Sequence, residues 1–264
     1  MMFALDVLTE LALLVLTIAS FLPQYRFIKK RQDCTGLSLA YLLLNLVVAT
    51  YDFTLCLEVV AIHWEGTYLV HQPRDARDWL NLAQFTAICL GHLILFSQAL
   101  SLPPRRPRAK VTAVIVCISF LMISLVPVLF EIYAEPGEPG FYTGMVVGSL
   151  LYFVGPPVQL CGIVAFWAQA RTIISNEPPI ALNLRGLLDQ SLVFLLVGIS
   201  FSFRFQMDPE YSNPYFIVYL RDWYWSLGWA TINNIIFAFG QGVLAIIACR
   251  YRSARSEECQ PLLG

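Results

Sequence analysis

Long apolar runs recur along the whole chain and are separated by short polar or proline-rich connections. A helix needs about 20 apolar residues to cross a hydrocarbon core of roughly 30 Å. By this measure the pattern predicts seven membrane-spanning helices, at residues 5–28, 37–61, 79–100, 111–133, 142–170, 186–206 and 222–249. We therefore expect an all-α membrane protein.

The composition supports this interpretation. Of the 264 residues, 58% are hydrophobic and only 13% are charged, about half the charged share of an ordinary soluble domain. The first apolar run has no basic segment before it and no small-residue cleavage site, so we interpret it as a retained span. The cysteines do not have the spacing of a disulfide framework.

Charge is distributed unevenly between the two sides of the predicted membrane. Thirteen of the seventeen lysines and arginines fall on one side, in clusters that follow alternate spans. Most acidic residues fall on the other side. The positive-inside rule therefore predicts a luminal amino terminus and a cytosolic carboxyl terminus.

The chain also contains an internal repeat. Gln24 matches Gln169 at an offset of 145 residues, and the triplet at 77–79 recurs at 221–223 as Arg-Asp-Trp. Because three spans reverse the side of the membrane, the helix at 111–133 returns the second set to the orientation of the first. The pattern predicts two parallel three-helix repeats joined by a linker helix, a 3+1+3 plan known in transporters.

This plan divides the chain into four parts. We expect a first repeat at 1–100, the linker helix within 101–141, a second and degenerate repeat at 142–249, and a cytosolic tail at 250–264. The tail contains Glu258 followed by Leu262 and Leu263, which matches the acidic dileucine signal that adaptor complexes read on lysosomal or vacuolar cargo. Because the pattern is short, a chance match is the alternative.

One segment carries a more specific signal. Pro23-Gln24 near the end of the first span, the basic run after it, and Gly36-Leu37-Ser38 at the start of the second follow one another in the order of the PQ-loop motif. With its 3+1+3 plan, the chain resembles the PQ-loop repeat proteins. These include cystinosin and the vacuolar or lysosomal exporters of cationic amino acids, and they are distantly related to the SWEET sugar transporters and the KDEL receptors.

Prolines inside spans are the candidate hinges. Proline removes a backbone hydrogen bond, so we expect Pro23 to bend the first helix while Gln24 supplies polar partners; a static kink is the alternative. In the second repeat, Ala168 stands before Gln169 where proline is expected, and Pro156-Pro157 lies upstream. Either the second hinge has moved to Pro156-Pro157, or this half is less mobile.

Several polar side chains interrupt the apolar runs, where they are costly unless paired. Asp52 could take up a proton on an acidic luminal side and release it to the cytosol, or it could be a neutral structural aspartate bonded to Tyr51 or Asn45. His92 could titrate at endosomal pH, or it could be an inward-facing structural histidine. Four amides could line a substrate pocket or bond between helices: Asn45, Gln190, Asn233 and Asn234.

No catalytic motif is present in the sequence. We expect no enzyme activity, cofactor, metal site or nucleic-acid partner. The resemblance and the topology favour a proton-coupled secondary transporter that exports a small polar solute, an amino acid by family, from the lysosome or vacuole. Its expected partners are the lipid bilayer, protons, the solute and an adaptor complex, and no oligomeric state is predicted. The alternative is a non-transporting seven-helix receptor, or a trafficking or lipid-distribution factor of the endomembrane system.

Overall fold

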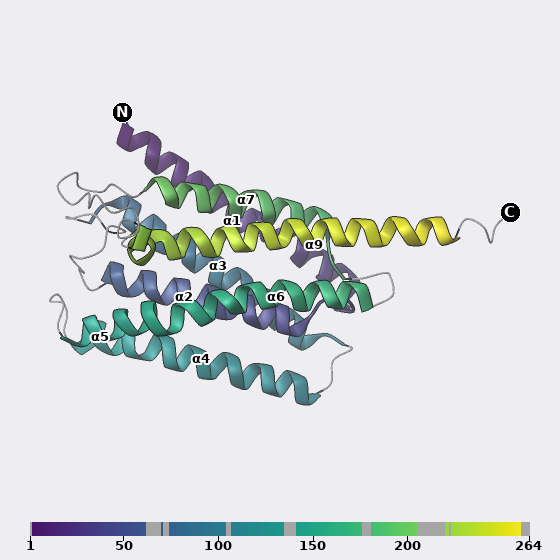
Figure 1. The fold of residues 1–264 in the computed structure, drawn as a ribbon, viewed down its shortest axis with the longest axis horizontal. Helices are drawn as coiled ribbons and strands as arrows, with labels where there is room; N and C mark the ends of the chain where they lie inside the picture. Colours follow the sequence, from purple (N-terminus) through teal and green to yellow (C-terminus); the bar gives the residue numbers. More distant parts are fainter. Residues whose placement is uncertain are drawn as a thin grey trace.

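The structure is a computed structural model that describes residues 2–61, 70, 74–103, 107–134, 141–175, 181–204, 220–221 and 223–259. Within these ranges every regular element is a helix (Figure 1). The α-helices are α1 (Met2–Arg31), α2 (Leu39–Ala61), α3 (Ala76–Ser101), α4 (Pro107–Ala134), α5 (Phe141–Ser149), α6 (Gly155–Ser175), α7 (Leu184–Phe203) and α9 (Trp229–Cys259). Two π-helical segments, η1 (Leu150–Val154) and η3 (Tyr224–Gly228), precede α6 and α9.

The prediction of an all-α protein with seven spans is confirmed. In the described part of the chain, seven helical segments are long and apolar enough to cross a membrane. The segments α5, η1 and α6 follow one another without a break and together supply the fifth span. The last helix continues well beyond the predicted end of its span, and in Figure 1 it extends past the bundle towards the carboxyl terminus.

Local sequence explains where several helices begin. Asp75 caps α3, since its carboxylate accepts from the backbone N–H of Arg77 at 2.8 Å, and Asp78 completes the capping box. Asn183 caps α7 by accepting from the N–H of Gly186 at 3.1 Å. Between α1 and α2, Gly36 has a φ of 81°, a left-handed conformation that glycine adopts without a steric penalty.

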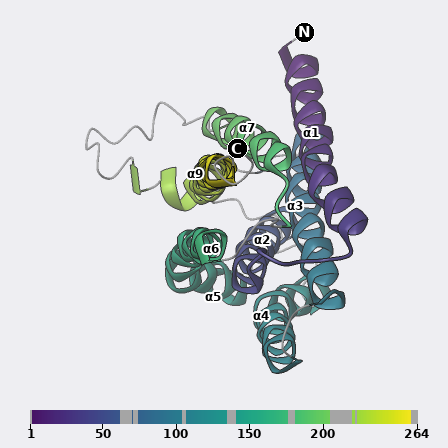
Figure 2. The same cartoon turned by 90° about the vertical axis from the view of Figure 1, so that its right-hand side faces the viewer.

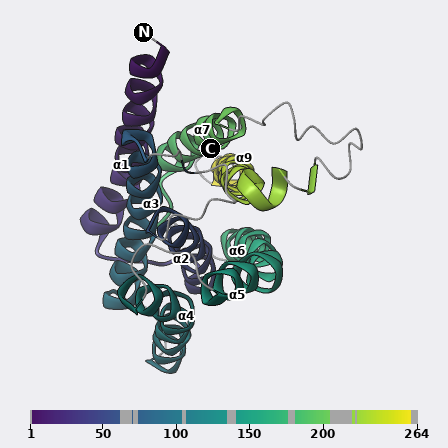
Figure 3. The ribbon, with the colours of Figure 1, turned by 90° about the vertical axis from the view of Figure 1, so that its left-hand side faces the viewer.

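The contacts among α1, α2 and α3, which we call the first set of helices, resemble those among α6, α7 and α9, the second set. In α2, 72% of the most apolar window is buried, against 22% in α4, which lies at the periphery (Figures 2 and 3). The pairing α2–α3 in the first set has its counterpart in α7–α9, and α1–α3 has its counterpart in α6–α9. Across the sets, α1 packs on α7 as α6 packs on α2. These are the contacts that the predicted repeat would produce.

The prolines of the two sets occupy different environments. The helix α1 continues through Pro23 to Arg31. Pro156 and Pro157 lie in the first turn of α6, directly after the π-helical η1, where the Gly155 N–H bonds to the carbonyl of Leu150 five residues earlier. Because proline has no N–H, the regular ladder cannot continue across this pair, and the wider π turn lies where the ladder is broken.

Candidate functional site

A small buried cavity lies in the middle of the bundle, among α2, α3, α7 and α9. Its volume is about 20 Å³, enough for one water molecule. Its polar lining consists of Asn45 and Asp52 on α2, His92 on α3, and Asn233 and Asn234 on α9. The structure therefore brings five of the predicted site residues together from three helices.

The central polar contact joins the two sets of helices. The amide of Asn233 donates to the Asp52 carboxylate at 2.7 Å, whereas Asn45 and Asn234 donate to backbone carbonyls of their own helices. Among the described residues, Asn233 Oδ1 and His92 Nδ1 have no hydrogen-bond partner. Buried polar atoms are normally paired, so both atoms are available to a guest in the cavity.

Aromatic rings close the cavity on one side. The Phe194 and Phe237 ring centroids are 4.4 Å apart, and Phe166 adds its edge to Phe237 at 5.6 Å. The His92 ring packs edge-on between Phe21 at 5.2 Å and Phe237 at 5.1 Å. Phe21 and Phe166 are 145 residues apart, so the two predicted repeats contribute equivalent rings to this layer.

A second aromatic layer lies on the other side of the cavity. Phe85 stacks on Trp229 at 5.5 Å and on Phe201 at 5.2 Å, and Tyr51 meets Trp229 edge-on at 6.3 Å. All four side chains are almost completely buried. The structure is therefore closed on both sides of the central cavity.

The glutamine of the Pro-Gln pair reaches across to the second set. Gln24 Nε2 donates to the Ala181 carbonyl at 2.9 Å, and Gln24 Oε1 accepts from the Asn183 N–H at 2.9 Å. The side chain of Asn183 also donates to the Pro23 carbonyl at 3.3 Å. One side chain thus binds both faces of the peptide segment that leads into α7.

Gln169 on α6 makes the equivalent contact with the peptide segment that leads into α2. Its Nε2 donates to the Gly36 carbonyl at 2.8 Å, and its Oε1 accepts from the Ser38 N–H at 2.8 Å. The three groups of this contact lie 145 residues from their counterparts at Gln24, one for one. We call these two contacts the glutamine clamp, and the end of the bundle that carries it the clamp end.

The opposite end of the bundle is joined by charge. Glu10 on α1 accepts from Arg77 at 3.1 Å and lies 3.6 Å from Arg204, which follows α7. Arg204 also bonds to Asn81 on α3 and to Ser200. Burial lowers the pKa of Arg204 to about 10, and the Glu10 carboxylate opposes this shift. Three helices are thus held together at what we call the ion-pair end.

Gln190 lies outside the lining of the central cavity. Instead it accepts from Gln241 Nε2 at 2.9 Å, and Gln241 also donates to the Tyr41 hydroxyl at 2.7 Å. Sequence analysis did not single out Gln241, although an amide within an apolar span is the signal that identified Asn233. It also did not single out Glu58, whose carboxyl contacts Glu131 between α2 and α4.

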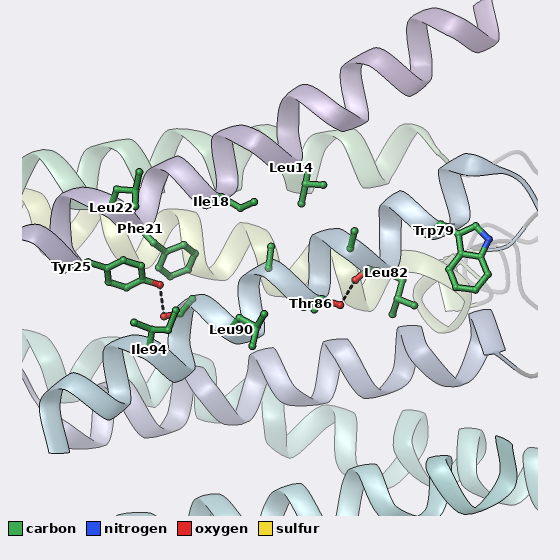
Figure 4. A pocket seen from close by; sticks show the side chains of 13 residues that line it. Leu14, Ile18, Phe21, Leu22, Tyr25, Trp79, Leu82, Thr86, Leu90 and Ile94 are labelled. Atoms are coloured by element: carbon green, nitrogen blue, oxygen red, sulfur yellow. Dashed lines mark hydrogen bonds between the residues drawn. The ribbon is translucent and has the colours of Figure 1, made fainter. Parts of the chain in front are cut away.

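A larger hollow lies on the outer face of the bundle, between α1 and α3 (Figure 4). Its volume is about 650 Å³, and its lining is mostly aliphatic, with Trp79 at one end. The Tyr25 hydroxyl, beside it, donates to the Gly91 carbonyl at 2.7 Å. None of the predicted site residues lines this hollow, so the central cavity is the better candidate site.

Two further predictions concern the tail and metal ligands. Glu258 lies in the last turn of α9, while Leu262 and Leu263 lie outside the described residues. A search of the described residues finds no group of three histidine, cysteine, aspartate or glutamate side chains that could hold a metal ion.

Comparison with known proteins bears on the first two helices. Residues 10–54 match the model of the PQ loop repeat family. The match contains Pro23, Gln24, Gly36, Ser38 and Asp52, and hence the Gln24 half of the clamp and the carboxylate of the cavity. Comparisons with curated proteins and with solved structures found no match. Residues 10–54 are therefore similar to a PQ loop repeat, and the seven apolar helices indicate a multi-pass membrane protein.

Proposed function

We propose that the protein is a proton-coupled secondary transporter that moves a small polar solute, an amino acid, by alternating access. The observation that carries this proposal is the buried cavity in which Asp52 of one helix set is bonded to Asn233 of the other. In transporters with parallel repeats, the substrate site lies between the two halves near the middle of the membrane. Residues 1–100 and 142–249 are the proposed halves, with the linker in 101–141.

The chemistry of the lining fits an amino acid. Asn233 Oδ1, which has no hydrogen-bond partner among the described residues, can accept from an ammonium group, and the amide N–H groups of Asn233 and Asn234 offer donors to a carboxylate. At about 20 Å³ the cavity has closed to the size of one water molecule. A solute can enter only when the aromatic layers separate, so we assign the structure to an occluded conformation.

The two closed ends supply the two gates of this proposal. From Asn183 in the clamp to Arg204 in the ion pairs, α7 rises about 32 Å, the thickness of a bilayer core. The charge pattern assigns the clamp end to the cytosol and the ion-pair end to the lumen. Pro23 next to the clamp, and Pro156-Pro157 beside the π turn, are the proposed hinges.

Proton coupling follows from the burial of Asp52. Asp52 is only 5% exposed, and its hydrogen-bond partner among the described residues is the neutral amide of Asn233. Closing the site around a charged carboxylate is costly because no cation offsets the desolvation. The occluded state therefore forms with a proton on Asp52, which is taken up from an acidic lumen and released to the cytosol. His92, packed among phenylalanines, is the second proposed titrating group.

Transport by the purified chain in liposomes tests the proposal. We expect an imposed proton gradient to drive one or more solutes from a panel of amino acids and sugars across the membrane, in the direction of proton flow. Asp52→Asn should keep solute exchange across the membrane but lose accumulation driven by pH, and Asp52→Glu should restore part of it. A cooperatively folded protein that moves no member of the panel, by gradient or by exchange, would refute the transporter and favour a receptor.

The organelle is proposed from the tail. Glu258, Leu262 and Leu263 would direct the protein to the lysosome or vacuole through an adaptor complex on the cytosolic side. Replacing both leucines with alanine should move a tagged full-length protein to the plasma membrane. An unchanged distribution would mean that the dileucine match is accidental.

A further inference from the structure

A charged groove lies between α1 and α7 at the clamp end. Its volume is about 540 Å³. Arg26 and Lys30 enter it from α1, one turn apart, and Arg185 enters it from the first turn of α7. The side chains of Leu22 and Phe27 add an apolar surface to the same groove.

Positive charge is concentrated in this groove. Of the described residues that line it, Asp189 is the one acid, and its carboxylate lies 3.8 Å from Arg185 in an exposed pair. Such a pair neutralises little in solvent. The net charge of the lining is therefore +2, from three cations and one anion.

The neighbouring basic residues on α1, Lys29 and Arg31, do not line this groove. Lys29 lines a different hollow, which α1 forms with α3. Arg31 packs over the Phe27 ring at 5.6 Å and pairs with Asp33 at 3.7 Å. Arg26 and Lys30 thus form a separate pair on the face of α1 that meets α7.

We propose that this groove binds the headgroup phosphate of an anionic phospholipid from the surrounding leaflet. Three cations around one site suit a phosphate, which arginine binds in a bidentate manner. The groove lies at the end of a predicted span and combines its cations with apolar side chains. A lipid matches this combination because its phosphate is attached to acyl chains that can contact the apolar side chains. A free phosphate has no apolar part that could make this contact.

The bound headgroup would reinforce the closed clamp. Pro23 and Asn183 also line the groove, and the Asn183 amide donates to the Pro23 carbonyl. A phosphate held by Arg26 and Lys30 on one side and by Arg185 on the other ties α1 to α7 next to this bond. Binding itself does not depend on the proposed transport activity.

The test uses the full chain in vesicles of phosphatidylcholine with increasing fractions of phosphatidylserine, and it follows the thermal unfolding midpoint. We expect the midpoint to rise with the anionic fraction. Each of Arg26→Gln, Lys30→Gln and Arg185→Gln should weaken the apparent affinity about tenfold, the loss of one hydrogen bond to a charged group. Asp189→Asn should tighten binding, because it removes the only negative charge in the described lining.

Lys29→Gln is the matched control, since it removes the same charge from the adjacent position of the same helix. Its response to phosphatidylserine should equal that of the unmodified protein. The proposal is overturned if Lys29→Gln and Lys30→Gln weaken the response equally, which would indicate general surface attraction. It is also overturned if inorganic phosphate in neutral vesicles raises the midpoint as much as the lipid does.

Discussion

Replacing Gln24 tests whether the clamp holds its end of the bundle closed. Gln24→Ala removes one donor and one acceptor, and with them the 2.9 Å bonds to the Ala181 carbonyl and the Asn183 N–H. A hydrogen bond contributes about 1 kcal/mol net, so the closed state loses about 2 kcal/mol. The open state loses nothing, because water solvates both backbone groups there. The opening equilibrium should therefore increase about 30-fold.

Amide hydrogen exchange of the reconstituted full chain measures this equilibrium at two reporters. The Asn183 N–H loses its own acceptor in the variant, so its exchange rises in any case. The Ser38 N–H is the informative reporter, because it remains bonded to Gln169. If both halves of the clamp open as one gate, exchange at Ser38 also rises about 30-fold. Gln24→Glu keeps the acceptor but turns a carboxylate oxygen towards the Ala181 carbonyl, so its effect should be at least as large as that of Gln24→Ala.

A glutamine outside the clamp provides the control. Gln98 lies on α3 and its side-chain oxygen has no hydrogen-bond partner among the described residues, so Gln98→Ala should leave both reporters unchanged. The reasoning fails if Gln24→Ala accelerates exchange at Asn183 and leaves Ser38 protected. In that case the two glutamines make independent local contacts, and they do not form a gate.

Two further substitutions probe the frame around the cavity. Glu10→Gln removes the carboxylate that Arg77 and Arg204 share at the ion-pair end. Because two partly buried cations then lose the negative charge between them, we expect a loss of about 3 kcal/mol, seen as a lower unfolding midpoint, and an unchanged midpoint would contradict this. Gly36→Ala places a side chain at a φ of 81° and should lower the free energy of unfolding by about 1–2 kcal/mol. Gly148→Ala is the control, because its helix has room for a methyl group. Equal losses of stability in the two variants would refute the argument.

The sequence was sufficient to predict the membrane spans and to identify Gln24 and Gln169 as equivalent positions. Bilayer thickness dictates the length of an apolar run, and the repeat offset aligns the two glutamines. An offset identifies equivalent residues, but it does not identify which residues touch. The partners of each glutamine are backbone groups of the other half, and no side-chain pattern marks them.

The carboxylate of the cavity illustrates the same limit. Its candidate partners in the sequence were the nearby Tyr51 and Asn45, but the bonded partner is Asn233, 181 residues away. Only the packing of α9 in the bundle brings that amide to α2. Likewise, the irregular helical geometry beside Pro156 requires backbone coordinates, because proline in sequence specifies a missing N–H and not the turn that accommodates it.

The glutamine clamp is symmetric between the two halves, whereas the lining of the central cavity is not. The clamp uses equivalent residues in both halves, so movement of one half at this end breaks bonds on both sides. The cavity is different, because the position equivalent to Asp52 is Val197, which is completely buried. Likewise, Phe21 packs on His92 in one half where its counterpart Phe166 packs on Phe237 in the other. Under the proposed transport function, a cavity with one carboxylate and one imidazole would favour one orientation of a polar solute, while the two halves that move around it are built alike.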